Sequence, residues 1–480
     1  MINERLLNKT CSRRNFITSA GALAGIASLG LSGLSCQKGA KSVATSQSGL
    51  KNMKIKNIDS DFERELLVRP FGFKGIYQKE FWVSAALLEN ESGNKQVGLM
   101  TQCLAWSDLN VFLAHTEAAG NMLLHTTLEH ALQLIKGVPF RTPIELQDAI
   151  LENVHQFGKK ITGSKNLRMT FTLSSLVALD LAAWMLYAQE NGFKNFDEMI
   201  PDDYKPALSY QHKAVAHVPL LSYNVPLNEI EAAVDQGYFF MKIKIGRPGS
   251  QEEMVKGDME RIEAIYKLIG HRETPHTLNG KIPFYFDANG RYEKKETLQR
   301  LLDHAKKVGM FEQIAVIEEP FPEEADIQVG DMGVRIAADE SAHTAQDVKK
   351  RIQMGYSAIA LKAAAKTLSM TMRMAKVAHE NNIPCFLADL TCTPILVDWN
   401  KNVAARLAPF PGLKDMGLLE SNGHQNYLHW KELVSYHPYP KGSWINSKDG
   451  IFNLNIDFYE KSGGALISSD HYLNLFASNH

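Results

Sequence analysis

Five short apolar runs, each with charged residues at or near its carboxyl end, constrain the fold of this chain more than any other feature. They occupy residues 240–245, 284–287, 316–318, 336–339 and 359–362, and helix-like stretches separate them. Runs of this length indicate parallel strands buried on both faces, where a closing charge is out of place. The carboxyl ends of the strands in a closed α/β barrel converge on one mouth. We therefore expect two lysines, three carboxylates and a further lysine to meet there.

The segment from Val215 onward alternates strand-like and helix-like patterns. If residues 219–222 are the first strand, the charged ends fall on the second to sixth, and residues 384–389 and 417–420 supply the seventh and eighth. Eight such steps complete a barrel. The predicted fold class is therefore α/β, with a (β/α)8-type barrel and an N-terminal α+β capping domain completed by the C-terminal segment. The predicted boundaries are an export signal at 1–36, a flexible linker at 37–51, the capping domain at 52–210, the catalytic barrel at 211–440, and a C-terminal segment at 441–480 that returns to the capping domain.

Charge and cysteine content exclude several classes of protein. The chain has 52 lysines and arginines against 53 aspartates and glutamates, and no dense basic run, so nucleic acid is not expected to be its partner. The five cysteines form no CxxC pair and no cluster at zinc spacing, which argues against a disulfide framework or a zinc site.

The N-terminal segment has the pattern of a targeting signal. The adjacent Arg13 and Arg14 precede an uncharged stretch at 16–35, which resembles a twin-arginine export signal. A membrane-spanning helix is the alternative, although the many glycines and serines make the stretch weakly apolar. Small residues before Cys36 resemble a bacterial lipoprotein cleavage box, with Gly33 where leucine is usual. We predict an exported bacterial protein that is periplasmic or held at the membrane by a lipid anchor on Cys36.

Three of the strand-end charges are carboxylates, on Asp287, Glu318 and Asp339. Carboxylates on adjacent strand ends repel one another unless a cation lies between them. A cage of oxygen ligands without histidine or cysteine suits Mg²⁺ better than zinc. These residues are the predicted metal ligands, and the alternative is a set of separately paired acids.

Lysines precede and follow the acids in strand order. Lys242 and Lys244 are two residues apart on one predicted strand, so both side chains point the same way. We expect nearby like charges and the metal to lower the lysine pKa toward the range of a general base. Lys244 and Lys362 would then face a substrate from opposite sides, one removing a proton and the other returning it. Salt bridges at the barrel mouth are the alternative for Lys242 and Lys362.

Taken together, these motifs resemble the muconate-lactonising subgroup of the enolase superfamily. The motifs are Lys242-x-Lys244, Asp287-Ala288-Asn289, Glu318-Glu319-Pro320, Asp339-Glu340-Ser341 and the strand-end Lys362. The resemblance implies a Mg²⁺-bound substrate carboxylate whose α-proton is abstracted to give an enediolate. It also implies that Lys244 is the base on one face, Lys362 the acid or base on the other, and Lys242 a modulator near the carboxylate. The segments 70–79 and 106–120 would be substrate-choosing lids.

The sequence departs from this subgroup at the strands that select the substrate. Dipeptide epimerases of the subgroup carry Asp-x-Asp on the eighth strand, where this chain reads Leu418-Leu419-Glu420-Ser421-Asn422. The seventh strand ends in Asp389, without the histidine base of the mandelate-racemase subgroup. Asp389, Glu420 and Asn289 are the candidate substrate-binding residues. The alternative for Asp389 and Glu420 is a structural role at the barrel mouth.

Together these features predict a Mg²⁺-dependent racemase or epimerase acting on a small-molecule carboxylate, in a homo-oligomer. The alternative is a lyase, such as a sugar-acid dehydratase, or a cycloisomerase on the same scaffold. A non-catalytic binding protein would lack a ligand or a lysine, and none is missing.

Overall fold

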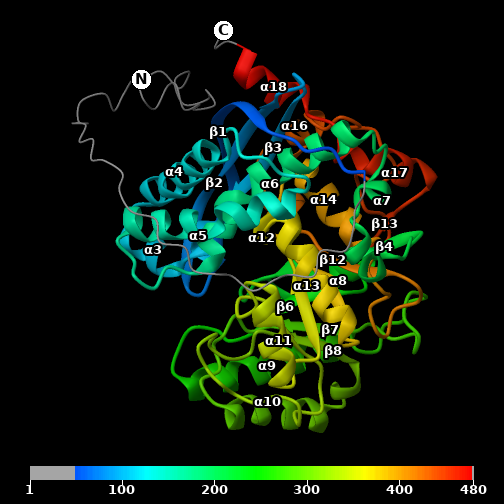
Figure 1. Ribbon diagram of the computed structural model, residues 1–480. Coiled ribbons are helices and arrows are strands. Elements are labelled where there is room, and N and C mark those ends of the chain that lie inside the picture. Colours follow the sequence, from blue (N-terminus) through cyan, green and yellow to red (C-terminus); the bar gives the residue numbers. More distant parts are fainter. Residues whose placement is uncertain (1–48, 478–480) are drawn as a thin grey trace, which may run out of the picture.

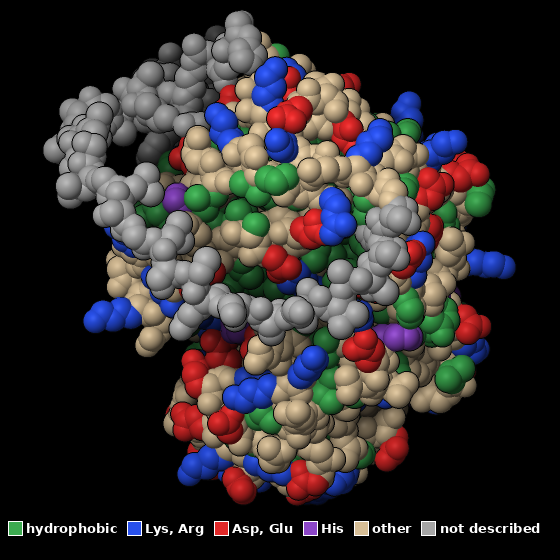
Figure 2. All heavy atoms as spheres, viewed as in Figure 1, with side chains coloured by type: hydrophobic (Ala, Val, Ile, Leu, Met, Phe, Trp, Pro, Cys, Tyr) green, Lys and Arg blue, Asp and Glu red, His purple; other side chains and the backbone are tan. Residues whose placement is uncertain are grey.

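The computed structural model describes residues 49–477. The predicted export signal, the candidate lipid anchor Cys36 and most of the predicted linker lie outside these residues. Figure 1 shows the described chain as two stacked parts, a capping layer of sheet and helices above a barrel of strands and surrounding helices. On the face shown in Figure 2, acidic and basic side chains are interspersed, in line with the formal net charge of −1.

An antiparallel sheet in the order β1-β2-β3 forms one side of the capping layer. Its strands are β1 (Ile55–Phe73), β2 (Ile76–Asn90) and β3 (Lys95–Gln102). Residues 91–94 form the turn between β2 and β3. The β1–β2 hairpin turns at Lys74 and Gly75, whose φ angles of 46° and 84° are left-handed. The predicted 70–79 flap is the tip of this hairpin.

Helices cover the sheet of the capping layer. They are α2 (Leu104–Ser107), α3 (Leu109–Ala114), α4 (Glu117–Ile135), α5 (Pro143–Thr162), α6 (Met169–Asn191), α7 (Phe196–Met199) and η2 (Asp202–Leu208). Gly98 on β3 lets the sheet approach α6 closely, because a Cβ there would lie 2.0 Å from the Ala178 carbonyl oxygen. Among residues 49–477, α6 alone has the length and mean hydropathy to cross a membrane, and it is buried as a core helix is.

The barrel is closed by its first strand, which consists of two segments separated by Pro219. Segment β4 pairs with the last barrel strand, β12, and segment β5 pairs with β6, so the ends of the parallel sheet meet. The strands are β4 (Ala214–Val218), β5 (Leu220–Leu221), β6 (Met241–Lys244), β7 (Phe284–Asp287), β8 (Ile314–Glu318), β9 (Ile336–Ala338), β10 (Ala358–Leu361), β11 (Cys385–Leu387) and β12 (Gly417–Glu420), with β13 (Ile451–Asn453) antiparallel to β4. The predicted α/β barrel with an N-terminal capping domain is confirmed.

Helices surround the barrel strands. They are α8 (Leu227–Asp235), α9 (Gln251–Ile269), α10 (Lys295–Val308), η3 (Phe311–Gln313), α11 (Ala345–Gln353), α12 (Ala363–Lys366), α13 (Leu368–Glu380), α14 (Pro394–Ala404), α15 (Gly423–Asn426) and α16 (Trp430–Ser435). A capping box between Ser250 and Glu253 starts α9. Leu298, Leu301 and Leu302, at helical spacing, form the buried face of α10.

The last part of the chain returns to the capping sheet. It contains α17 (Ile456–Lys461), η4 (Ser462–Gly464) and α18 (Asp470–Ala477). The Ser468 hydroxyl accepts a hydrogen bond from the Val97 N–H at 2.9 Å, and His471 lies 2.9 Å from a carboxylate oxygen of Glu63. Asp180 on α6 accepts hydrogen bonds from the Leu368 and Ser369 N–H groups at 2.8 and 3.2 Å. These bonds connect the capping layer with the C-terminal segment and the barrel.

Candidate active site

The carboxyl ends of β6, β7, β8 and β12 bring Lys242 together with three carboxylates. Its ammonium nitrogen lies 2.9 Å from oxygens of both Asp287 and Glu318, and 3.0 Å from an oxygen of Glu420. All four side chains are buried. The second oxygen of Glu318 accepts the hydroxyl of Tyr285, which lies one strand away on β7. Lys242 therefore supplies the positive charge that makes this acidic group tolerable without solvent.

Lys244 contacts one of these acids, Asp287. Its ammonium lies 2.6 Å from Asp287 and also donates to the amide oxygen of Asn289. The Asn289 amide nitrogen in turn donates to a carboxylate oxygen of Glu340 at 2.9 Å. Asn289, which the sequence proposed for substrate binding, thus connects the candidate base with the acidic cluster.

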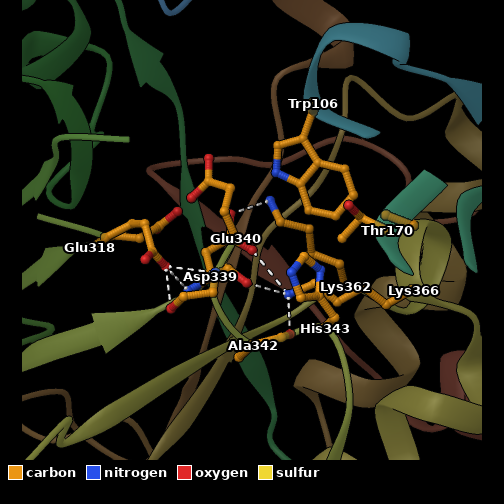
Figure 3. Close-up of polar contacts among 12 residues, drawn as sticks. Trp106, Thr170, Glu318, Asp339, Glu340, Ala342, His343, Lys362 and Lys366 are labelled. Atoms are coloured by element: carbon orange, nitrogen blue, oxygen red, sulfur yellow. Dashed lines mark hydrogen bonds and ion pairs between the residues drawn. The ribbon is translucent and has the colours of Figure 1, made fainter. Parts of the chain in front are cut away.

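The other side of the site is built on Asp339, directly after β9. The Lys362 ammonium lies 3.1 Å from one oxygen of Asp339, and the Lys366 ammonium lies 3.2 Å from the other. Lys366 also donates to the backbone oxygens of Asp339 and Ala342 at 2.8 and 3.0 Å. Figure 3 shows both lysines on the same side of Asp339, below the ring of Trp106. Sequence analysis missed Lys366, although its place four residues after Lys362 was a signal.

The oxygens that could share a cation come from Glu318, Asp339 and Glu340. One carboxylate oxygen of each lies within 4.8 Å of the others, and all three side chains are buried. The Oε2 atom of Glu340 has no hydrogen-bond partner among the described residues, which leaves it free to accept a cation. An all-oxygen group of this kind fits Mg²⁺. Asp287, the third predicted ligand, lies outside this group and contacts Lys242 and Lys244 instead. Glu340 was present in the Asp-Glu-Ser motif but was not named as a ligand.

Burial and mutual charge shift the pKa values of the acids in opposite directions. Burial raises the pKa of Glu318 to about 7, even though Lys242 opposes the rise. Burial and then the neighbouring Glu340 raise the pKa of Glu319 to about 8. Burial works to raise the pKa of Asp339 too, but Lys362 and Lys366 outweigh it and hold that pKa well below its usual range. Asp287 likewise has two lysine partners, Lys242 and Lys244, which outweigh burial and lower its pKa to about 2, so Asp339 and Asp287 are the firmly ionised acids.

The lysines do not have the lowered pKa values that the sequence argument expected. Burial acts to lower the pKa of Lys242, but Asp287, Glu318 and Glu420 outweigh it and raise the pKa well above its ordinary value. Burial is likewise outweighed at Lys362, where Asp339 raises the pKa. Only at Lys366, the residue that was missed, does burial exceed the effect of Asp339 and lower the pKa. The expectation was wrong for Lys242 and Lys362 because their ammonium groups lie 2.9 and 3.1 Å from carboxylate oxygens, which favour the charged form.

Backbone geometry at the strand ends is unusual. Asn289, Glu319 and Thr391 follow β7, β8 and β11, and their φ angles of 44°, 40° and 60° are left-handed. Such conformations cost energy in residues other than glycine, so the surrounding contacts must hold them. Glu319 is held because one of its oxygens accepts the Asp339 N–H at 2.8 Å, together with the N–H and hydroxyl of Ser341.

The two candidate acids on β11 and β12 also reach the site. Asp389 accepts hydrogen bonds from the Thr391 and Asn422 N–H groups at 2.8 and 3.3 Å, and burial followed by the charge of Glu420 raises its pKa to about 7. Glu420 accepts the Asn422 amide at 3.1 Å in addition to Lys242. Both acids line the same cavity as the lysines.

That cavity is small and covered. Its volume is about 30 Å³, and every predicted site residue except Glu318 lines it. The ring centre of Phe73, from the hairpin tip, lies 6.0 Å from the Lys244 ammonium. The ring centre of Trp106 lies 5.0 Å from the Lys362 ammonium. Such a volume holds one or two water molecules. In this structure the capping layer therefore closes the barrel mouth.

Arg168 holds part of this cover in place. It donates to the Trp106 carbonyl oxygen at 2.9 Å and to the Glu340 carbonyl oxygen at 3.2 Å. Its guanidinium also lies 2.5 Å from Glu323, on the loop after β8. Arg168, which precedes α6, thus ties the capping layer to the strand ends beside the acids.

A closed parallel barrel with carboxylates and lysines at its strand ends, capped by an α+β layer, defines an α/β-barrel protein with a candidate metal-dependent site. Residues 227–436 match the family described as Enolase C-terminal domain-like. The matched residues run from α8 to α16, so the similarity to this family concerns the barrel region of the chain. No curated protein matches the chain.

Solved structures show the same fold over most of the chain. An unknown member of the enolase superfamily from Enterococcus faecalis is 18% identical with a TM-score of 0.58, covering 88% of this chain and 98% of its own. A dipeptide epimerase from Cytophaga hutchinsonii, complexed with Mg and D-Ala-L-Val, is 16% identical with a TM-score of 0.57 and coverages of 78% and 89%. An N-succinyl Arg/Lys racemase from Bacillus cereus is 16% identical with a TM-score of 0.56 and the same coverages. At these identities the likeness concerns the fold.

Proposed function

We propose that the protein is a Mg²⁺-dependent racemase or epimerase that abstracts the proton α to a carboxylate and passes through an enediolate. The observation that carries this proposal is the placement of Lys244 and Lys362. They stand on β6 and directly after β10, on either side of the three strands that bear the acids, and both line one cavity. The racemase and the epimerases among the structures of similar fold are consistent with this chemistry.

Glu318, Asp339 and Glu340 would hold the metal, with Asp287 as the further predicted ligand. When bound, Mg²⁺ supplies Lewis-acid stabilisation of negative charge on the substrate carboxylate. Lys244 would remove the α-proton on one face of the substrate, and Lys362 would deliver a proton on the other face. Lys242 would add positive charge near the carboxylate, while the Phe73 and Trp106 rings exclude water from the site.

The test is mass spectrometry of a pooled carboxylate library incubated with purified protein and Mg²⁺ in D₂O. The library contains dipeptides, amino-acid derivatives and sugar acids. We expect one member to gain one deuteron at unchanged connectivity, and Lys244→Ala or Lys362→Ala to abolish that gain. Lys256→Ala, which removes an exposed lysine from α9, is the matched control and should exchange normally. Exchange that survives both active-site variants would refute the roles given to the two lysines.

The same experiment separates racemisation from the alternative chemistry. A lyase such as a sugar-acid dehydratase releases water, so its product is lighter than the substrate. A cycloisomerase keeps the mass but changes the connectivity. Chelation of divalent cations by EDTA should stop the exchange, and added Mg²⁺ should restore it.

Export is part of the proposal. The twin-arginine pattern at Arg13 and Arg14 would direct the chain across the bacterial inner membrane, and Cys36 would carry the lipid anchor. Cell fractionation of the full-length chain tests both points. Replacing both arginines with lysine should keep the protein in the cytoplasm, while Cys36→Ser should release it from the membrane fraction. A membrane-bound Cys36→Ser variant would contradict the anchor.

A further inference from the structure

A second and much larger cavity lies beside the covered site. Its volume is about 600 Å³, and it is bounded by the hairpin tip, the loops after β5 and β6, and the middle of α9. None of the predicted site residues lines it, but Phe73 lines both cavities. Small-molecule sites commonly measure about 300–1,000 Å³. The inner cavity has room for a few atoms at most, so the larger one is the space available for the rest of a substrate.

Phe73 is the wall that the two cavities share. Two lysine ammonium groups lie near its ring, Lys74 at 5.6 Å and Lys244 at 6.0 Å from the ring centre. Tyr223, on the loop after β5, lines the larger cavity, and burial followed by the Asp287 carboxylate raises its pKa well above the usual range. The larger cavity therefore reaches the edge of the acidic cluster, and movement of one aromatic ring on a hairpin tip would join it to the inner one.

Arg247 is positioned within this cavity by its neighbours. The preceding Gly246 has a left-handed φ of 80° and turns the chain back toward α9. There the arginine side chain lies over Gly257, where an added Cβ would be 2.5 Å from both Cδ and Nη1 of Arg247. No other residue than glycine at position 257 leaves this space open. The absence of a side chain at Gly257 thus makes room for the arginine side chain.

The guanidinium of Arg247 has no hydrogen-bonding partner among the described residues, although its positive charge works to lower the pKa of Asp258 in the same cavity. Within residues 49–477 its guanidinium makes no hydrogen bond or ion pair. The Nη2 atom of Arg261 donates to the Ser222 carbonyl oxygen at 3.0 Å, while its Nε has no hydrogen-bond partner among the described residues. Asp258 accepts the Gly246 N–H at 2.6 Å and the Tyr292 hydroxyl at 2.7 Å, and Glu260 is exposed. A free guanidinium pairs best with a planar or tetrahedral oxyanion, through two parallel hydrogen bonds.

We propose that the larger cavity binds the distal end of the substrate and that Arg247 selects a second anionic group there. The substrate class is a dianion, with one carboxylate for the acid–lysine site and a carboxylate, phosphate or sulfonate at its far end. This inference rests on the proposed function for the placement of the first carboxylate. Arg247 is a specificity-determining residue and takes no part in the proton transfer.

Matched ligand pairs test this inference by binding. L-alanyl-L-glutamate is compared with L-alanyl-L-glutamine, and N-succinyl-L-alanine with N-butanoyl-L-alanine, by titration calorimetry in Mg²⁺. We expect the anionic member of a pair to bind about 10- to 100-fold more tightly, the range of one charge-assisted bidentate contact. Arg247→Gln should bring this ratio close to one. Gly257→Ala should reduce it partly, because the added methyl group displaces the guanidinium but keeps its charge.

Arg300→Gln is the control for general electrostatics. Arg300 pairs with Glu252 on the outer surface of α9 and does not line the cavity. It should preserve the wild-type ratio. The proposal is overturned if wild type shows no preference for the anionic member of any pair, or if Arg300→Gln lowers the ratio as much as Arg247→Gln does. Thermal melting of each variant checks that it is folded.

Binding and proton exchange fail independently. If anionic ligands bind in an Arg247-dependent way but no ligand exchanges its α-proton, the substrate class stands and the proposed reaction is wrong. If exchange occurs only with ligands that have a neutral or cationic far end, and Arg247→Gln leaves their affinity unchanged, the reaction stands and the inference about Arg247 is wrong.

Discussion

Replacement of Lys366 by methionine tests the part of the site that the sequence did not predict. Lys366 is fully buried, and its ammonium donates to a carboxylate oxygen and a backbone oxygen of Asp339 and to the Ala342 backbone oxygen. Methionine keeps the length and the apolar stem but removes the charge and all three donors. No water replaces them in a buried position, so three acceptors lose a partner.

The expected loss of stability follows from these contacts. Breaking a buried ion pair by removing one partner costs about 3–5 kcal/mol. Lys362 remains 3.1 Å from Asp339 and keeps the carboxylate from being unpaired, so we expect no more than this range. With an unfolding entropy of about 2.1 cal/mol/K per residue over roughly 430 described residues, the melting temperature should fall by about 3–6 °C.

Differential scanning calorimetry measures this shift, and Lys376→Met is the matched control. Lys376 lies on α13, where its side chain is 37% exposed and its ammonium is 4.0 Å from Glu380. Such a surface pair contributes at most about 1 kcal/mol. The control should therefore melt within about 1 °C of wild type. If Lys366→Met melts as the control does, the bonds of Lys366 do not hold Asp339 in place, and the argument fails.

Three further predictions concern pH, the metal and the cover of the site. Burial raises the pKa of Glu65 from 4.5 to about 7, so the stabilising contribution of its protonated form is present below about pH 4.5 and is lost as the pH rises toward 7. Glu65→Gln should therefore stabilise the protein at about pH 8 by at most about 3 kcal/mol. Urea unfolding that shows no gain in stability for this variant would contradict the prediction. Because the pKa of Glu318 is raised to about 7, protons compete with the cation at lower pH. The affinity for Mg²⁺, measured by calorimetry, should rise about tenfold per pH unit up to about pH 7. An affinity that does not change with pH would show that Glu318 is not a metal ligand. Arg168→Met removes the ion pair with Glu323 and the hydrogen bond to the Trp106 carbonyl oxygen. The rate at which the substrate exchanges its α-proton in D₂O should therefore fall about tenfold or more. An unchanged rate would show that Arg168 does not position the capping layer over the site.

Several features of the site were predictable because they follow from the pattern of buried strands that end in charged residues. A charge at the end of a doubly buried strand must lie at the barrel mouth, whichever helices separate the strands. Lys242, Lys244, Asp287, Glu318 and Lys362 accordingly meet at one end of the barrel. The pairing pattern of the strands, and hence their order, was predictable for the same reason.

Other features depended on side-chain directions that spacing does not define. Glu340 and Lys366 lie one and four residues beyond strand ends, and only the loop after β9 and the short helix α12 turn them toward Asp339. The pKa values of Lys242 and Lys362 were predicted in the wrong direction because each depends on which charge lies nearest, and Lys242 lies 2.9–3.0 Å from three carboxylates.

The sequence by itself determined the barrel, the row of acids and the lysines on either side. Buried strands and the charges at their ends can be recognised in short stretches of sequence. Tertiary structure alone decided which three oxygens lie within reach of one cation, and that a hairpin tip from the capping layer separates a small inner cavity from a larger outer one. These properties arise where segments far apart in the chain come together, as Phe73 and Arg247 do around the outer cavity. Contacts of that kind depend on distances in space, which no spacing along the sequence specifies.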